Sequence, residues 1–191
     1  MDNNDAVVQG VITEQKIKKQ KIYGIIFSIT MIFISIFIFG GNRLVNKYYE
    51  TRNYFYHIEN ELSIFSQVNF IWGTGHNMLV VASRYDVMNQ YVQNLYNSLN
   101  MLTYGDYFDT SYNLNRVVNA MSILDEQREI LGLDETDINH FDFFMADIES
   151  AMRIISNSDF NNRVTVFNDR VTSFSSNIIR AIRNIDLLPY F

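Results

Sequence analysis

The chain has 191 residues, with 15 Lys and Arg, 21 Asp and Glu, one Pro and no Cys. Without Cys it can form no disulfide and no thiolate nucleophile, and it lacks the commonest ligands of structural zinc. Residues 42–191 carry 11 basic and 18 acidic side chains. This balance argues against nucleic acid as a partner, because phosphates require basic patches.

The first predicted element is a membrane-spanning helix. Twenty residues without a charge run from Ile22 to Gly41, and a helix of that length spans about 30 Å, the hydrocarbon core of a bilayer. A buried core helix would normally keep a polar face, which this segment lacks. A cleaved signal peptide would have an apolar part of about 7–15 residues and a small-x-small cleavage site, which Phe39-Gly40-Gly41 matches poorly. We therefore predict a short N-terminal tail, residues 1–21, and an uncleaved transmembrane helix, residues 22–41.

Basic residues flank the predicted span unequally. Positive charge is retained on the cytoplasmic side of a membrane. Four closely spaced lysines precede the span and three more widely spaced basic residues follow it: Lys16, Lys18, Lys19 and Lys21 before it, and Arg43, Lys47 and Arg52 after it. The bias predicts a single-pass cell-membrane protein with a cytoplasmic N-terminus and an extracytoplasmic helical domain.

Apolar residues spaced alternately by three and four predict that residues 42–191 form one helical-bundle domain. This spacing places side chains on one stripe of a helix, and its mean of 3.5 favours helices packed at about +20°. No segment alternates with period two for long, so a sheet has no support. Four stripes run from 44 to 72, 78 to 102, 114 to 131 and 138 to 155. Short connections make neighbouring helices antiparallel. We therefore predict an all-α chain, in which an antiparallel bundle of four long helices follows the transmembrane helix.

Glycines and acidic residues predict where these helices begin and end. Gly73-Thr74-Gly75 is expected to separate the first two helices, and residues 104–110 the second and third. Gly132 is expected to end the third helix as a C′ residue, and Asp134 to lie at the positive start of the fourth. The apolar phase then slips at residues 156–159. A kink, a π-bulge and a short break all remain open there.

The stretch FNNRVTVFNDRVTSF, residues 160–174, repeats a Phe-Asn pair after seven residues. Its apolar residues form a helical stripe, so Asn161 and Asn168 lie together at the edge of that stripe. The two amides either bond to a neighbouring helix or to water, or they form a shared polar site between helices. The apolar segment Leu187–Phe191 is expected to dock on the bundle, with the membrane surface or a partner as alternatives.

The same stretch resembles the LemA family of bacterial membrane proteins. Members show a tyrosine-asparagine pair, a valine three residues on, a second such pair, a phenylalanine-proline and a final proline-tyrosine-phenylalanine. The matching residues here are Phe160-Asn161, Val164, Phe167-Asn168, Val171, Phe174-Ser175 and Leu188-Pro189-Tyr190-Phe191, with further similarity at Asn42-Arg43-Leu44-Val45 and Asn77-Met78-Leu79-Val80. Phenylalanine at 160 and 167 and serine at 175 mark a divergent member. The resemblance implies an N-terminal anchor and a soluble helical bundle, and the family offers no established active site to transfer.

Reactive and ligating side chains form no recognisable site in the sequence. The three histidines have no metal-ligand spacing between them. Gly73-Thr74-Gly75-His76 lacks the third glycine, the lysine and the preceding strand of a phosphate loop. The acids after Gly132 lack the alternating ligands of a calcium loop and suit a helix start better. The residues considered are His57, His76, His140, Asp134, Glu135, Asp137 and Asp142. The sequence therefore predicts no catalytic residue, no cofactor site and no metal site.

These observations favour a non-enzymatic scaffold or interaction module held in the membrane by residues 22–41. Its partners would be the lipid bilayer and unidentified proteins, and the heptad stripes fit self-association equally well. The alternative is a sensory or signalling accessory, in which small helix shifts pass from the span to a partner protein. An enzyme, such as a hydrolase, is the hypothesis with the least support.

Overall fold

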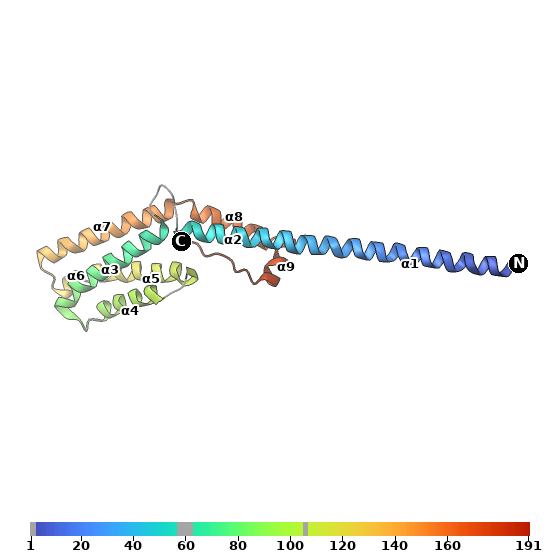
Figure 1. Cartoon of the computed structure of the whole chain (residues 1–191). Helices are drawn as coiled ribbons and strands as arrows, with labels where there is room; N and C mark the ends of the chain where they lie inside the picture. Colours follow the sequence, from blue (N-terminus) through green and yellow to red (C-terminus); the bar gives the residue numbers. More distant parts are fainter. Residues whose placement is uncertain (1–2, 57–62, 105–106) are drawn as a thin grey trace. The chain divides into compact units, whose positions relative to one another are not determined.

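Every regular element within the residues described by the computed structural model is a helix (Figure 1), and those residues are 3–56, 63–104 and 107–191. For these residues the prediction of an all-α chain is confirmed. The chain divides into two compact units. The first unit comprises the described residues up to Asn46 and Ser173–Ile185, and the second comprises Lys47–Thr172 and Asp186–Phe191.

The first unit is built on one long helical stretch. α1 (Asn3–Ser35) passes without a break into a π-helical segment, η1 (Ile36–Gly40), and then into α2 (Gly41–Tyr56). By length and composition, Lys16–Tyr56 is the one helical stretch among the described residues that could cross a membrane, with a mean hydropathy of 2.5 over 18 residues. In the same unit α9 (Phe174–Arg183) contacts η1.

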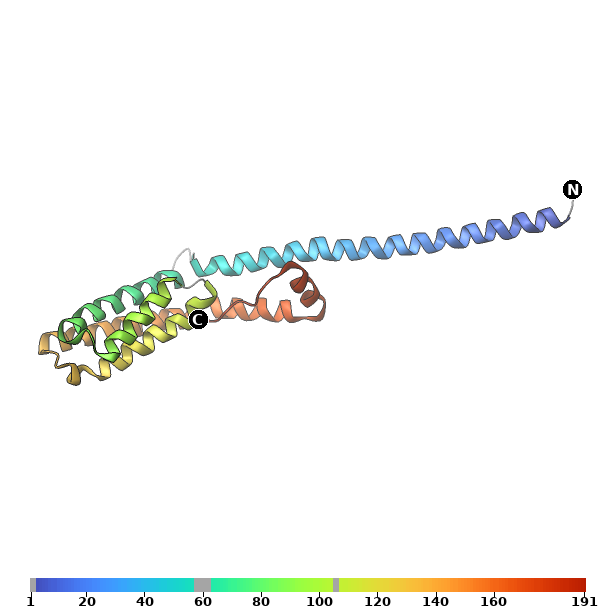
Figure 2. The same ribbon diagram turned by 90° about the horizontal axis from the view of Figure 1, so that it is seen from below.

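The helices that lie wholly within the second unit are α3 (Ile64–Asp86), α4 (Gln90–Tyr104), α5 (Tyr107–Glu126), α6 (Arg128–Leu131), α7 (Glu135–Asn157) and α8 (Phe160–Thr172). α3 contacts α4, α5 and α7, while α5 also contacts α4 and α7, and these helices lie side by side in both views (Figure 1, Figure 2). Their facing stripes supply a core of buried apolar side chains, whose removal from water stabilises the unit. Fully buried members include Ile71, Met78, Leu95, Leu99, Val117, Met121, Leu124 and Phe141.

The predicted break at Gly73-Thr74-Gly75 is wrong, because these residues lie in the middle of α3. Glycine weakens a helix relative to alanine, so a packing reason is expected for it there. Gly75 has such a reason: a Cβ at this position would lie 2.8 Å from Leu99 Cδ2 and 3.2 Å from Met121 Sδ. The bare backbone at Gly75 therefore lets α3 come close to α4 and α5.

The second predicted helix, residues 78–102, is in fact divided between α3 and α4. α3 ends at Asp86, whose Oδ1 accepts the Met88 N–H at 3.0 Å. α4 begins after Asn89, whose Oδ1 accepts the Tyr91 N–H at 2.9 Å. Short polar side chains of this kind compete with the helix for backbone groups. Met88 lies three residues after Tyr85 and four before Val92, so its spacing fits the predicted stripe 78–102, yet it is 80% exposed at this turn.

The first predicted helix, residues 44–72, is divided too. α2 ends at Tyr56, and α3 begins behind Ser63, whose backbone is extended with ψ 153° and whose Oγ accepts the Ser66 N–H at 3.1 Å. Such a cap satisfies an N–H group that has no partner inside the helix. Residues 57–62 lie outside the described residues, as do residues 105–106 of the predicted turn at 104–110. The rest of that predicted turn is helical, because α4 extends to Tyr104 and α5 begins at Tyr107.

Two predicted helix ends are confirmed. The third predicted helix, residues 114–131, is divided at Gln127 into α5 and α6. Gly132 ends α6 in the left-handed conformation, with φ 71°, and its N–H bonds back to carbonyl oxygens of the preceding turn. Asp134 caps α7 by accepting the Asp137 N–H at 2.9 Å. Both ends depend on local chemistry, namely a glycine that tolerates positive φ and a carboxylate that accepts a free N–H.

The phase slip at residues 156–159 is a break between two helices. α7 ends at Asn157, Ser158 is extended with ψ 149°, and α8 begins at Phe160. A second extended residue, Ser173 with ψ 148°, separates α8 from α9. The helical stripe that the sequence continues through residues 160–174 therefore ends at Thr172, and α9 belongs to the first unit.

Candidate functional site

The repeated Phe-Asn pair of α8 holds an extended segment of the same chain. Asn168 Nδ2 donates to the Leu188 carbonyl oxygen at 2.9 Å, and the Leu188 N–H donates to Asn168 Oδ1 at 3.0 Å. Asn161 binds Phe191 in the same way: its Nδ2 donates to the main-chain oxygen, and its Oδ1 accepts the N–H at 2.8 Å. We call Asn161, Asn168 and the segment Asp186–Phe191 the asparagine clamp.

The seven-residue spacing of the two asparagines matches the segment that they hold. Seven residues of α-helix rise about 10.5 Å, and three residues of extended chain span about 10 Å. Each side-chain amide therefore pairs with the N–H and the carbonyl of one backbone residue, as the backbone of a neighbouring β-strand would do. The segment runs antiparallel to α8, since Asn161 meets Phe191 and Asn168 meets Leu188 (Figure 2). Both sequence-based alternatives for these amides are wrong, because the partner is extended backbone rather than a helix or a shared polar site.

Apolar contacts reinforce the asparagine clamp. Leu188 is 2% exposed. The Phe191 ring centroid lies 4.8 Å from that of Phe55 and 5.6 Å from that of Phe160. Aromatic pairs at such distances stabilise beyond their buried area by about 0.5–1.5 kcal/mol. As predicted, the segment 187–191 docks on helices of its own domain, and the helices that it contacts here are α8 and α2.

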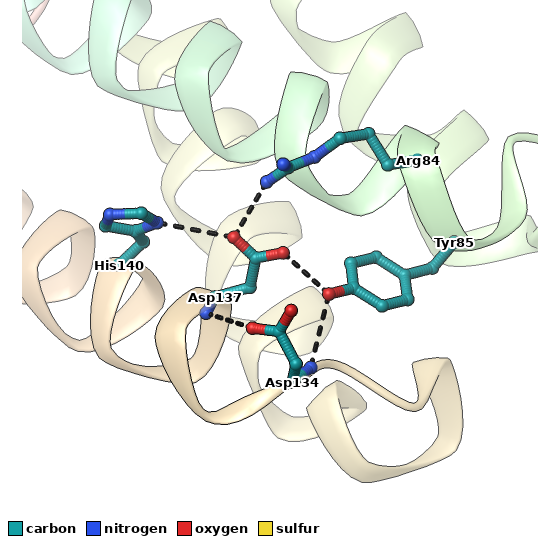
Figure 3. A network of polar contacts seen from close by, with 5 residues as sticks. All are labelled: Arg84, Tyr85, Asp134, Asp137 and His140. Carbon is teal, nitrogen blue, oxygen red and sulfur yellow. Dashed lines mark hydrogen bonds and ion pairs between the residues drawn. The ribbon is translucent and has the colours of Figure 1, made fainter.

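A second polar cluster joins the end of α3 to the start of α7 (Figure 3). The buried Asp137 carboxylate accepts the Tyr85 hydroxyl at 2.6 Å and Arg84 Nη2 at 2.7 Å, and His140 Nδ1 lies 3.3 Å from it. The Asp134 N–H donates to the Tyr85 hydroxyl oxygen at 3.2 Å. We call these five residues the Asp137 cluster. The sequence predicts a helix start at Asp134 and Asp137 but gives no signal for Arg84 and Tyr85, which lie on α3, 53 and 52 residues before Asp137 in the chain.

Within the Asp137 cluster the pKa values of Asp137 and Tyr85 are shifted in opposite directions. The hydrogen bond from Tyr85 lowers the pKa of Asp137, and His140 and Arg84 lower it further, against the opposing effect of burial. For Tyr85, the Asp134 N–H favours the phenolate, but the bond to Asp137, burial and the two carboxylates outweigh it and raise the pKa of the phenol. A general base or acid works best with a pKa near the operating pH. The lowered pKa of Asp137 and the raised pKa of Tyr85 both move further from neutral pH. The cluster therefore suits a structural role, in which it joins α3 to α7.

The remaining acids considered for calcium take other positions. Asp142 on α7 accepts Arg128 Nη1 at 2.7 Å, and the same guanidinium bonds to Asp125. Asp125 and then Asp142 raise the pKa of Arg128 through these bonds, against its partial burial. Glu135 is exposed in the first turn of α7. Asp134 and Asp137 thus belong to the Asp137 cluster, whereas Asp142 forms an ion pair with Arg128.

The described histidines lie in separate places. His140 belongs to the Asp137 cluster, whereas His76 lies within α3, with its ring centroid 4.2 Å from that of Trp72. His76 Nδ1 is buried, with no hydrogen-bond partner among the described residues. His57 lies outside them. Within the part of the chain that the structure describes, no three His, Cys, Asp or Glu side chains gather around a possible metal position.

A charged groove of about 330 Å³ lies between α2 and α8 in the second unit. Lys47 pairs with Glu50 at 2.7 Å, and Arg163 pairs with Asp159 at 2.9 Å. The Arg163 guanidinium also lies 4.1 Å from the ring centroid of Tyr54. Both signs of charge thus line the groove. We call it the α2–α8 groove.

Comparison with known proteins gives no relative for this chain. No family model, no curated protein and no solved structure matches it. The similarity of its Phe-Asn repeat to the LemA family remains a prediction, which rests on the residues themselves.

Proposed function

We propose that this chain is a single-pass, membrane-anchored protein whose helical domain acts as a non-enzymatic scaffold or interaction module. In this proposal residues 22–41 form the anchor. The domain is an antiparallel bundle of four long helices, with α3, α4, α5 and α7 as its members. The N-terminus is cytoplasmic and the bundle extracytoplasmic, and the chain is a divergent member of the LemA family.

The observation that carries the anchor proposal is the exposure of its apolar side chains. Tyr23, Phe27 and Phe39 are 68%, 66% and 73% exposed, and the isoleucines between them are nearly half exposed or more. A core helix buries such side chains, whereas a lipid-facing helix requires them outside. Transfer of apolar surface out of water lowers the free energy by roughly 25 cal/mol per Å². In this proposal the acyl chains of a bilayer surround these exposed apolar side chains.

The proposed scaffold role is supported by the hydrogen bonds that polar residues make within the domain. Asp137, Asn161 and Asn168 hold the domain's own elements together through short, directed hydrogen bonds. Polar side chains that hold the domain's own elements together favour a structural role for these residues over a catalytic one. The α2–α8 groove is then the surface offered to a protein partner, because its two ion pairs present both signs of charge.

A sensory or signalling accessory is the second candidate function. It is favoured by the unbroken helical stretch from α1 through η1 into α2. π-helical segments are rare and occur frequently at functional sites. η1 lies at the end of the apolar run, where a shift of the span would first reach the helix beyond it.

Cysteine labelling tests the anchor and its orientation, since the chain has no Cys of its own. One variant carries Met88→Cys at the exposed α3–α4 turn, and another carries Lys16→Cys before the span. Intact cells are treated with a membrane-impermeant maleimide. We expect the first variant to be labelled in intact cells and the second only after lysis. Met121→Cys, at a fully buried position, is the control that reports loss of folding.

Each result decides a separate part of the proposal. The reverse labelling pattern would leave the anchor standing and overturn the orientation. Release of the full chain from membranes by alkaline carbonate would overturn the anchor itself, because a spanning helix stays in the bilayer under that treatment.

A further inference from the structure

α9 is a short helix with two different apolar sides. It begins after the extended Ser173 and ends at Asn184, which adopts the left-handed conformation. Ile179 is 5% exposed, whereas Ile178 and Ile182 are 46% and 63% exposed. Residues 178 and 182 are four apart and therefore share one face of the helix. One side of α9 is covered by protein, and the neighbouring apolar face is open.

The covered side of α9 lies against the end of the apolar run in the same unit. A Cβ at Gly40 would lie 3.3 Å from Ile179 Cδ1, and a Cβ at Gly41 would lie 3.2 Å from Arg183 Nε. Arg183 Nη2 also donates to Asn42 Oδ1 at 3.4 Å. The two glycines leave room for α9 at this level. α9 is therefore fixed at the residues where the charge-free segment stops and polar sequence begins.

The charge of α9 differs from that of the rest of the domain. Residues 173–185 contain two arginines and no acidic residue, whereas residues 42–191 as a whole carry more acid than base. Arg180 and Arg183 lie in the last turn of α9, and Arg43 follows closely after the glycines. Basic side chains near the end of a span interact favourably with lipid phosphates, and their apolar stems can lie along the acyl boundary.

We propose that α9 is a lipid-binding helix that lies in the membrane–water interface beside the end of the span. Ile178 and Ile182 insert into the boundary between headgroups and acyl chains, and Arg180 and Arg183 contact lipid phosphates. This inference rests on the proposed anchor, because the span is what places α9 at that depth. A helix with an apolar face and basic flanks lies in the interface plane with that face about 5–10 Å deep.

Spin-label accessibility on the full chain tests this inference. Single cysteines replace Ile178, Ile182, Phe27 or Met88, and each labelled variant is reconstituted in nanodiscs of phosphatidylcholine and phosphatidylglycerol. Collision with oxygen reports lipid, and collision with a water-soluble nickel complex reports water. Phe27→Cys is the reference for the bilayer interior, and Met88→Cys is the reference for water.

We expect labels at Ile178 and Ile182 to collide with oxygen several-fold more than with nickel, relative to Met88, and at a shallower depth than Phe27. A lipid signal at Phe27 with water-like labels on α9 would overturn the inference and leave the anchor in place. Water-like behaviour at Phe27 as well would overturn the anchor. Shielding of the α9 labels from both reagents would mean that protein covers this face, either a second copy or a partner, and would also overturn the inference.

Discussion

Asn168 and Leu188 are joined by two buried hydrogen bonds, in which the amide of one side chain pairs with the N–H and the carbonyl of one backbone residue at 2.9 and 3.0 Å. Leu188 belongs to no helix or sheet, so its N–H and carbonyl lack the partners that a helix supplies, and Asn168 provides them, as buried backbone groups require. The asparagine clamp thus ties α8 to a segment that would otherwise expose apolar side chains.

Asn168→Ala is expected to destabilise the helical domain by about 2–4 kcal/mol, because it removes two hydrogen bonds and leaves two buried backbone groups unpaired. Asn162→Ala, at an exposed position of the same helix, is the matched control and should change stability by less than about 0.5 kcal/mol. Urea unfolding followed by the fluorescence of Trp72 measures both. Equal effects of the two variants would contradict the clamp.

The two asparagines should act as one unit. Asn161 and Asn168 hold the same short segment, so release at one position weakens the other. In a double-mutant cycle, Asn161→Ala and Asn168→Ala together should cost about 1 kcal/mol less than the sum of the single variants. Hydrogen exchange at the Leu188 and Phe191 amides supplies an independent readout, since both should lose protection in either single variant. Strict additivity would show that the two asparagines act independently rather than as one unit.

Gly75→Ala is expected to destabilise the domain by about 1–3 kcal/mol, because the new methyl group would lie 2.8 Å from Leu99 Cδ2 in a filled core. Gly73→Ala is the matched control two residues away, where a Cβ would meet nothing within 4 Å. That variant should stabilise α3 by about 0.5–1 kcal/mol through the helix preference of alanine. The opposite signs of the two changes are measured by thermal or urea unfolding. Stabilisation by both would refute close packing at Gly75.

The Asp137 cluster should make stability fall in acid. The folded-state pKa of Asp137 is lowered, so its contribution is complete above the ordinary carboxyl pKa and is lost as pH falls through the lowered value. Asp137→Asn should therefore be less stable at neutral pH and show a weaker acid dependence than the unsubstituted chain. Asp147→Asn, at an exposed site on the same helix, should keep the acid dependence intact.

Tyr85→Phe tests the cause of that shift. The Tyr85 hydroxyl makes the largest contribution to lowering the pKa of Asp137, so its removal should move that pKa back toward the ordinary value. Carbon-13 NMR titration of the Asp137 carboxyl group measures the change directly. An unaltered titration would assign the shift to Arg84 and His140 instead.

Sequence patterns predicted those features that depend on a few adjacent residues. The helix end at Gly132 and the cap at Asp134 follow from backbone chemistry within one turn, and both are found. The predicted turn at Gly73-Thr74-Gly75 is wrong because glycine serves turns and close packing alike, and only the proximity of Leu99 and Met121 separates the two uses.

The predicted helix through Met88 is wrong because apolar spacing does not register the flanking Asp86 and Asn89, whose side chains bond to the backbone where α3 ends and α4 begins.

By itself the sequence determined that the described chain is helical, and it located the long apolar stretch near the N-terminus, since periodicity and charge-free length are properties of the linear chain. Only the tertiary structure decided what Asn161, Asn168 and Asp137 do. Their partners lie on elements well separated from them in sequence, and a side-chain amide or carboxylate has no preferred partner until folding brings a donor or acceptor within about 3 Å.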